Sequence, residues 1–292
     1  PPGSVEQSLG GRSRIANGNT MNIEQGLLAK TQANHRGRRR YVDRPHAHID
    51  HDTWNHSPKK LPRASEVKLG DLHGILPFNG VRNPSSRSNT SQKVFFPYGT
   101  PATGYKHRIG IAESAAEAIV GFEAIICPTV YDVTFQPLTV QFRDEKGKSR
   151  SYTHDILITF RNGHCRLVFV RNEASLIKPR TQRDIRAIAA STPPHVADDM
   201  IVVNANDYGR QRRDNMMRMH YFVTHPDVEA DEELRRVAES GQPFYYMKDL
   251  FPHASVAAPR AFAACYRLIA QDVLRANLDH VLWENSRIEV PA

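Results

Sequence analysis

Six apolar segments between residues 112 and 204 constrain the fold of this chain more than any other feature. The first and fifth have the three- or four-residue spacing of amphipathic helices, and the other four have the alternation or short apolar run of strands. They cover residues 112–126, 130–142, 149–160, 165–171, 181–191 and 200–204. Pro128 stops the first helix, and Pro137 interrupts the second segment. The order helix, three strands, helix, strand predicts a mixed α/β layer.

Two acidic residues and one cation lie within three of these segments. Glu117 lies near the start of the first helix, Asp155 directly precedes an apolar strand, and Arg171 ends the next strand. A carboxylate from a helix and another from a sheet can share a divalent metal, and a nearby cation can hold a phosphate or the attacking water. We therefore expect all three to be catalytic residues, with Glu117 and Asp155 as ligands of Mg²⁺ or Mn²⁺. This arrangement is typical of metal-dependent DNA cleavage.

Positive charge dominates the chain and one stretch in particular. The net charge is +8 and the isoelectric point is about 9.5, which favours an acidic partner such as nucleic acid. Residues 81–108 carry five Lys or Arg residues and no Asp or Glu, directly before the acidic helix. We expect these cations to contact DNA phosphates, the alternative being an ordinary solvated loop. They are Arg82, Arg87, Lys93, Lys106 and Arg108.

Residues 1–80 have little apolar periodicity and are interpreted as a basic, irregular N-terminal arm. Within it, His-Ala-His-Ile-Asp-His at 46–51 matches the H-x-H-x-D-H pattern with which metallo-β-lactamases hold two metals. That pattern normally follows a buried hydrophobic strand, whereas here a basic, Pro-containing segment precedes it. A two-metal site, a structural metal and a plain polar loop remain alternatives.

Several protein classes are disfavoured by composition. No run of 18 apolar residues exists, so we expect no membrane span, and residues 1–20 lack the apolar core of a secretory signal. Three cysteines far apart in the sequence fit neither a disulfide framework nor a zinc site. The sequence thus predicts a protein of the reducing cytoplasm.

The pattern changes after residue 220. Three helices are expected, followed by a terminal strand, and together they have the size of a winged-helix domain. Whether this domain touches DNA stays open, because its first helix is acidic. The expected elements cover residues 228–240, 246–251, 259–274 and 282–290. We accordingly divide the chain into an arm (1–80), an α/β core (81–220) and a C-terminal domain (221–292).

The order of motifs resembles the PD-(D/E)XK nucleases, and more closely the TnsA family of endonuclease subunits of heteromeric transposases. The resemblance covers roughly residues 80–290. It rests on Ser-Ala-Ala-Glu at 114–117, Tyr-Asp-Val-Thr-Phe-Gln-Pro at 131–137, Tyr-Thr-His-Asp at 152–155, Val-Phe-Val-Arg at 168–171 and the tail 267–278.

This resemblance implies a restriction-endonuclease-like mixed-sheet core with a C-terminal winged-helix-like helical domain. Glu117 and Asp155 match the metal-binding acids of the family. By the same resemblance, the protein would cut the 5′ strand at transposon ends beside a DDE-type transposase, with an AAA+ ATPase regulator as a further partner. It would act on double-stranded DNA in the nucleoid-associated cytoplasm of a bacterium.

The third strand departs from the family pattern, which has Glu or Gln, one residue, and then Lys. Here these positions hold Phe169, which cannot bind a metal, and Arg171, which stays protonated and favours bidentate phosphate contact. Lys178 is a candidate replacement for the lysine. The departure favours an alternative function, a nuclease-fold subunit that binds DNA and partner proteins without cutting. A third hypothesis is a regulatory DNA-binding protein with no affinity for metal.

Each candidate side chain also has a plain structural interpretation. Glu117 is then a solvated carboxylate on a helix face, Asp155 makes a turn hydrogen bond, and Arg171 is a surface cation.

The hairpin joining the second and third strands has a register that these roles require. Side chains alternate between the two faces of a strand, so Asp155 and Arg171 share a face only if the turn has an odd number of residues. A two-residue Asn162-Gly163 turn would separate them. We predict a three-residue turn over 161–163 with Gly163 in the left-handed region.

Overall fold

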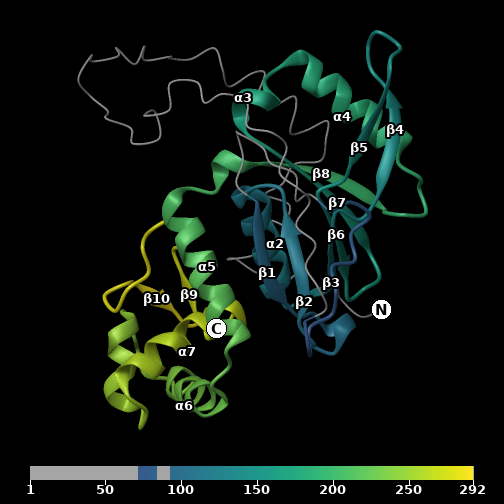
Figure 1. Cartoon of the computed structure of the whole chain (residues 1–292). Coiled ribbons are helices and arrows are strands. Elements are labelled where there is room, and N and C mark those ends of the chain that lie inside the picture. Colours follow the sequence, from purple (N-terminus) through teal and green to yellow (C-terminus); the bar gives the residue numbers. More distant parts are fainter. Residues whose placement is uncertain (1–71, 84–92, 292) are drawn as a thin grey trace, which may run out of the picture.

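A four-stranded mixed sheet forms the centre of the computed structural model, which describes residues 72–83 and 93–291 (Figure 1). The strand order is β3-β6-β7-β8; neighbours are antiparallel except β7 and β8, which are parallel. The strands are β3 (Val130–Phe135), β6 (Ile156–Phe160), β7 (Cys165–Arg171) and β8 (Asp199–Asn204). The expectations for the N-terminal arm, the histidine cluster at 46–51 and Arg87 lie outside the described residues.

One face of the sheet is covered by two helices and a hairpin. These are α2 (Ala115–Ile126), α5 (Arg210–Thr224) and the antiparallel pair β1 (Val94–Tyr98) and β2 (Arg108–Ala112). Their apolar side chains form one core with Val168 and Val170 of β7. A short 3-10 helix, η2 (Pro101–Thr103), lies in the connection between β1 and β2.

The opposite face carries a second core. It is built from α3 (Glu173–Leu176), α4 (Pro179–Ser191) and a hairpin of β4 (Thr139–Arg143) and β5 (Ser149–Thr153). Leu167 and Phe169 of β7 belong to this second core. Strand β7 is therefore buried on both faces, which explains why its sequence is a continuous apolar run instead of an alternating pattern. The mixed sheet with helices on both faces is consistent with a nuclease-like fold.

Three sequence-based boundaries are corrected by the structure. The predicted helix 112–126 begins only at Ala115, because residues 108–112 pair with β1. The predicted strand 130–142 is two strands in separate sheets, since Gln136 has φ 53° and Pro137 cannot donate a ladder hydrogen bond. The predicted strand 149–160 likewise breaks at residues 154–155, between β5 and β6.

The turn between β6 and β7 confirms the predicted register. Ile156 faces Val168, and the Phe160 N–H donates to the His164 carbonyl (2.8 Å), which leaves a three-residue turn with Gly163 at φ 86°. Asp155, Phe169 and Arg171 consequently point to the same side of the hairpin.

The last part of the chain packs on α5. It contains α6 (Val228–Ala238), the 3-10 helix η4 (Met247–His253), α7 (Ala258–Ala270) and a two-residue ribbon of β9 (Arg275–Ala276) and β10 (Ile288–Glu289). The predicted terminal strand 282–290 is wrong in extent, because only two of its residues pair in this ribbon. A further 3-10 helix, η3 (Ala205–Asp207), links β8 to α5.

Helix α5 connects this part to the sheet core. It runs across residue 220, and its Met216 and Met219 share the first core with Tyr266 of α7. The division of the chain at residue 220 stays a prediction. No helix among residues 72–83 and 93–291 combines the length and apolar character needed to cross a bilayer.

Candidate active site

Glu117 is held at the N-terminus of α2 by a reciprocal capping arrangement. The Ser114 hydroxyl accepts from the Glu117 N–H (3.2 Å), and Glu117 Oε2 accepts from the Glu113 N–H (2.9 Å). The spacing Ser-x-x-Glu therefore sets both the start of the helix and the direction of the carboxylate. Glu117 is only 4% exposed, so its interpretation as a solvated helix-face residue is wrong.

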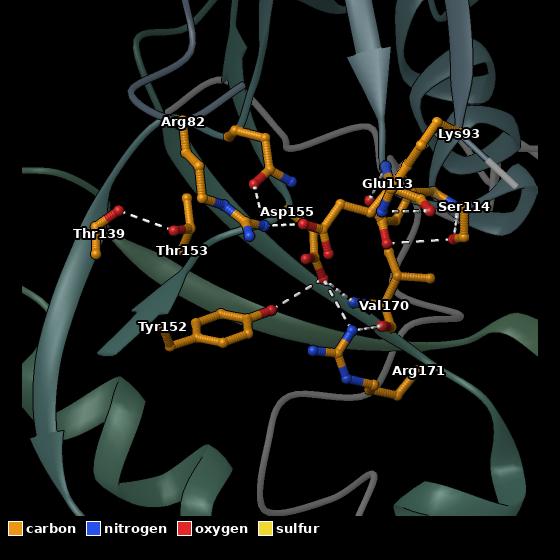
Figure 2. Close-up of polar contacts among 12 residues, drawn as sticks. Arg82, Lys93, Glu113, Ser114, Thr139, Tyr152, Thr153, Asp155, Val170 and Arg171 are labelled. Atoms are coloured by element: carbon orange, nitrogen blue, oxygen red, sulfur yellow. Dashed lines mark hydrogen bonds and ion pairs between the residues drawn. The ribbon is translucent and has the colours of Figure 1, made fainter. Parts of the chain in front are cut away.

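Asp155 lies where the chain passes from β5 to β6 and is 2% exposed. Its Oδ2 accepts from the Val170 N–H of β7 (2.8 Å) and from the Tyr152 hydroxyl of β5 (3.0 Å), as Figure 2 shows. These partners are on other strands, so the interpretation as a local turn bond is wrong. The two contacts fix one oxygen of the carboxylate at the edge where β5, β6 and β7 meet.

Arg171 lies against two aromatic rings, those of Phe169 and Tyr152, whose centres are 5.1 Å apart. Its guanidinium carbon lies 4.7 Å from the ring centre of Phe169 and 5.7 Å from that of Tyr152. Its Nη1 donates to the Val170 carbonyl (2.9 Å) and is 3.9 Å from Asp155 Oδ2. Phe169 thus supports the arginine through a cation–π contact, at the position where the motif described in the sequence analysis has Glu or Gln. The side chain is 33% exposed, which argues against a simple surface cation.

The two carboxylates repel each other in a poorly solvated site. Burial, and secondly the charge of Asp155, raise the pKa of Glu117 to about 8. Burial also raises the pKa of Asp155, although Arg171 and the Val170 N–H oppose this shift. Such a pair retains a proton near neutral pH, and a bound cation would displace it.

The donor set suits a hard divalent cation. Carboxylate oxygens are preferred by Mg²⁺ and Mn²⁺, and Mg²⁺ is commonly held by one or two carboxylates together with waters and substrate phosphates. Glu117 and Asp155 fit this description. No group of three or more His, Cys, Asp or Glu side chains able to hold a metal occurs in the described part of the chain.

The cations predicted to bind DNA divide into two groups. Arg82 forms an ion pair with Glu113 and donates to Gln136 Oε1 (3.0 Å), and the Lys93 ammonium donates to the Glu113 carbonyl (3.3 Å), so both lie at the site (Figure 2). Lys106 is exposed in the connection between β1 and β2, and Arg108 is a half-buried residue of β2. The structure brings only the first group to the carboxylates.

Some participants were not assigned a role from the sequence. Tyr152 and Gln136 both lie in the sequence motifs described above. Nothing in those motifs indicates that Tyr152 hydrogen-bonds to Asp155 or that Gln136 accepts from Arg82. Lys178, the candidate replacement lysine, is the N-cap of α4, and its side chain makes no capping hydrogen bond.

A central mixed sheet, with a buried carboxylate at the start of helix α2 and another before strand β6, is consistent with a nuclease-like α/β fold. Residues 127–205 match the protein family described as TnsA-like endonuclease N terminal, which confirms the resemblance seen in the sequence. The matched segment contains Asp155, Phe169 and Arg171, whereas Glu117 lies just before it. A comparison with curated protein sequences gave no match.

Proposed function

We propose that the protein is a TnsA-like DNA endonuclease subunit of a heteromeric transposase, which cuts the 5′ strand at transposon ends by metal-dependent hydrolysis. One observation carries the proposal. Glu117 and Asp155 are both buried and close enough for their charges, and that of Arg171, to affect the pKa of Glu117. Asp155 and Arg171 also lie in the segment that matches the TnsA-like family.

The side chains divide the work as follows. Glu117 and Asp155 would hold Mg²⁺ or Mn²⁺, which when bound would supply an activated water and a positive charge for the phosphoryl oxygen. Arg171 is kept charged and oriented by Phe169 and Tyr152, so that its exposed edge can contact the scissile phosphate. Tyr152 and the Val170 N–H keep Asp155 in position.

The remaining assignments concern partners. Double-stranded transposon-end DNA would follow the basic residues of the stretch 81–108, with Lys106 and Arg108 contacting phosphates away from the carboxylates. A DDE-type transposase and an AAA+ ATPase are the expected protein partners, and the C-terminal helices are assigned a winged-helix-like role in that assembly. The complex would act at the bacterial nucleoid.

A second candidate is a nuclease-fold subunit that binds DNA and partner proteins but does not cut. The specific observation in its favour is the packing of Arg171 on Phe169. Phenylalanine at this position cannot bind a metal, and its ring restrains the cation. Loss of positioning by about 1 Å can cost on the order of a hundredfold in rate.

Cleavage mapping on the assembled complex distinguishes these candidates. Transposon-end DNA labelled on each strand is incubated with Mn²⁺, the transposase and either the wild type, Phe169→Gln, Arg171→Lys or the double variant. We expect the wild type to nick the 5′ strand, with Arg171→Lys alone reduced because lysine stacks less well on the ring. Absence of any wild-type nick, together with cleavage by the double variant, would favour the non-cutting subunit instead.

A further inference from the structure

Lys93 approaches the carboxylate pair from a different element than Arg171. It directly precedes β1, and its ammonium group donates to the carbonyl of Glu113 (3.3 Å), the residue whose N–H is bound by Glu117 Oε2. Figure 2 shows Lys93 beside Glu113 and Ser114, on the side of the site formed by the start of α2. The side chain is half-buried, and attraction between Lys93 and Glu117 is one of the electrostatic interactions that act on it.

Arg171 is poorly suited to move toward the phosphate oxygens when their negative charge increases during the reaction. Its guanidinium is stacked on Phe169 and Tyr152, and one nitrogen is already bound to the Val170 carbonyl. A lysine ammonium is a compact charge on a flexible stem with three donors, and Lys93 uses one of them in the contact given above. The other two donors of the ammonium group are not used in that contact.

We propose that Lys93 is the catalytic ammonium group of this site, supplying from the β1 side the positive charge that the third strand has lost as a lysine. It donates hydrogen bonds to the phosphoryl oxygens, where negative charge increases in the transition state. The inference rests on the proposed endonuclease function. In the hydrolysis, the water oxygen bonds to phosphorus while the bond to the leaving oxygen breaks. The water proton passes to solvent, the leaving oxygen takes one from solvent, and Lys93 keeps its own protons.

The test uses the full chain in its assembled complex and the substitution Lys93→Met, which keeps the length of the side chain without its charge. Single-turnover cleavage at saturating DNA is expected to fall about a hundredfold. DNA affinity, measured by anisotropy with Ca²⁺ in place of Mn²⁺, is expected to stay within about threefold, as for the loss of at most one phosphate contact. The matched control is Lys148→Met, which replaces an exposed lysine in the turn between β4 and β5. It should change neither the cleavage rate nor the DNA affinity.

Two further measurements exclude a merely structural role. Lys93→Met should tighten Mn²⁺ binding by the purified chain about two- to tenfold, because the lysine ammonium no longer repels the metal ion near Glu117. Lys93→Cys treated with bromoethylamine, which restores an ammonium group, should recover cleavage, whereas bromoethanol should not. The treated wild type controls for Cys127, Cys165 and Cys265.

The outcomes separate this inference from the proposed function. If the wild type cleaves and Lys93→Met cleaves equally fast, Lys93 is not catalytic, although the endonuclease function stands. If Lys93→Met loses DNA affinity in proportion to its rate, the residue is only a phosphate contact. A wild type that never cleaves in the complete complex overturns both proposals.

Discussion

Replacing Asp155 with asparagine is expected to reduce cleavage of transposon-end DNA by the assembled complex on the order of a thousandfold. The substitution keeps the shape of the side chain, and the amide oxygen can still accept from the Val170 N–H and the Tyr152 hydroxyl. It removes the negative charge that would hold the metal. The measurement is a single-turnover nicking assay in Mg²⁺ and in Mn²⁺.

The control for this prediction is Asp132→Asn. Asp132 is an acid of the neighbouring strand β3, and its carboxylate accepts from the Thr100 hydroxyl (2.7 Å) instead of facing Glu117. We expect this variant to keep the wild-type rate. Equal rates for Asp155→Asn and the wild type would remove Asp155 from the catalytic group.

The second large effect concerns stability and pH. In the folded chain the pKa of Glu117 is raised from an ordinary 4.5 to about 8, so the folded state retains a proton that the unfolded state has lost between these values. Stability without metal should therefore fall as the pH rises from about 4.5 to about 8, and stay low above that. Glu117→Gln carries no such proton. Across this pH range its free energy of unfolding should therefore fall less than that of the wild type, by on the order of a few kcal/mol.

Urea unfolding of both proteins in EDTA at pH 6.5, 7.5 and 8.5 measures this difference. Comparing wild type with Glu117→Gln cancels the contributions of His154 and His220, which both proteins contain and whose pKa values burial lowers to about 4. The neighbouring Asp155, Lys93 and Arg171 remain in both variants. Added Mn²⁺ should restore wild-type stability at pH 8.5 and leave the variant nearly unchanged. Parallel pH curves in EDTA would show that Glu117 is ionised in the folded state.

The sequence was informative where one physical rule decides the structure. Strand β7 coincides with the predicted segment 165–171 because its central residues 167–170, which are buried on both faces of the sheet, form a continuous apolar run. The hairpin register followed from the alternation of side chains and from one glycine, Gly163, that can adopt a left-handed conformation. Both the pattern and its consequence are local, so no tertiary contact was needed to predict them.

Other elements depend on contacts that a single sequence does not display. Helix α5 escaped prediction because its buried face includes Arg212, Asn215 and His220, and polar residues obscure an apolar pattern. Arg212 is tolerated there because it pairs with Glu123 of α2 (2.7 Å). The β1–β2 hairpin was hidden by Pro97 and by the polar composition of its surroundings.

The candidate site shows the same division. Its acids lie in recognisable motifs, but Lys93 reaches the Glu113 carbonyl and Tyr152 reaches Asp155 only because separate hairpins pack beside α2 and β7. The chemistry of its side chain alone predicts that Phe169 cannot bind a metal. Its use as a platform for Arg171 required coordinates.

The central claim is that Glu117 and Asp155 form a divalent-metal site, and Mn²⁺ titration calorimetry on the purified chain tests it without any partner. We expect the wild type and Asp132→Asn to bind Mn²⁺ with release of protons near pH 7, because the carboxylate pair must give up a proton. Asp155→Asn should bind at least about a hundredfold more weakly. Wild-type protein that shows no saturable heat, or Asp155→Asn that binds as tightly as the wild type, would contradict the assignment.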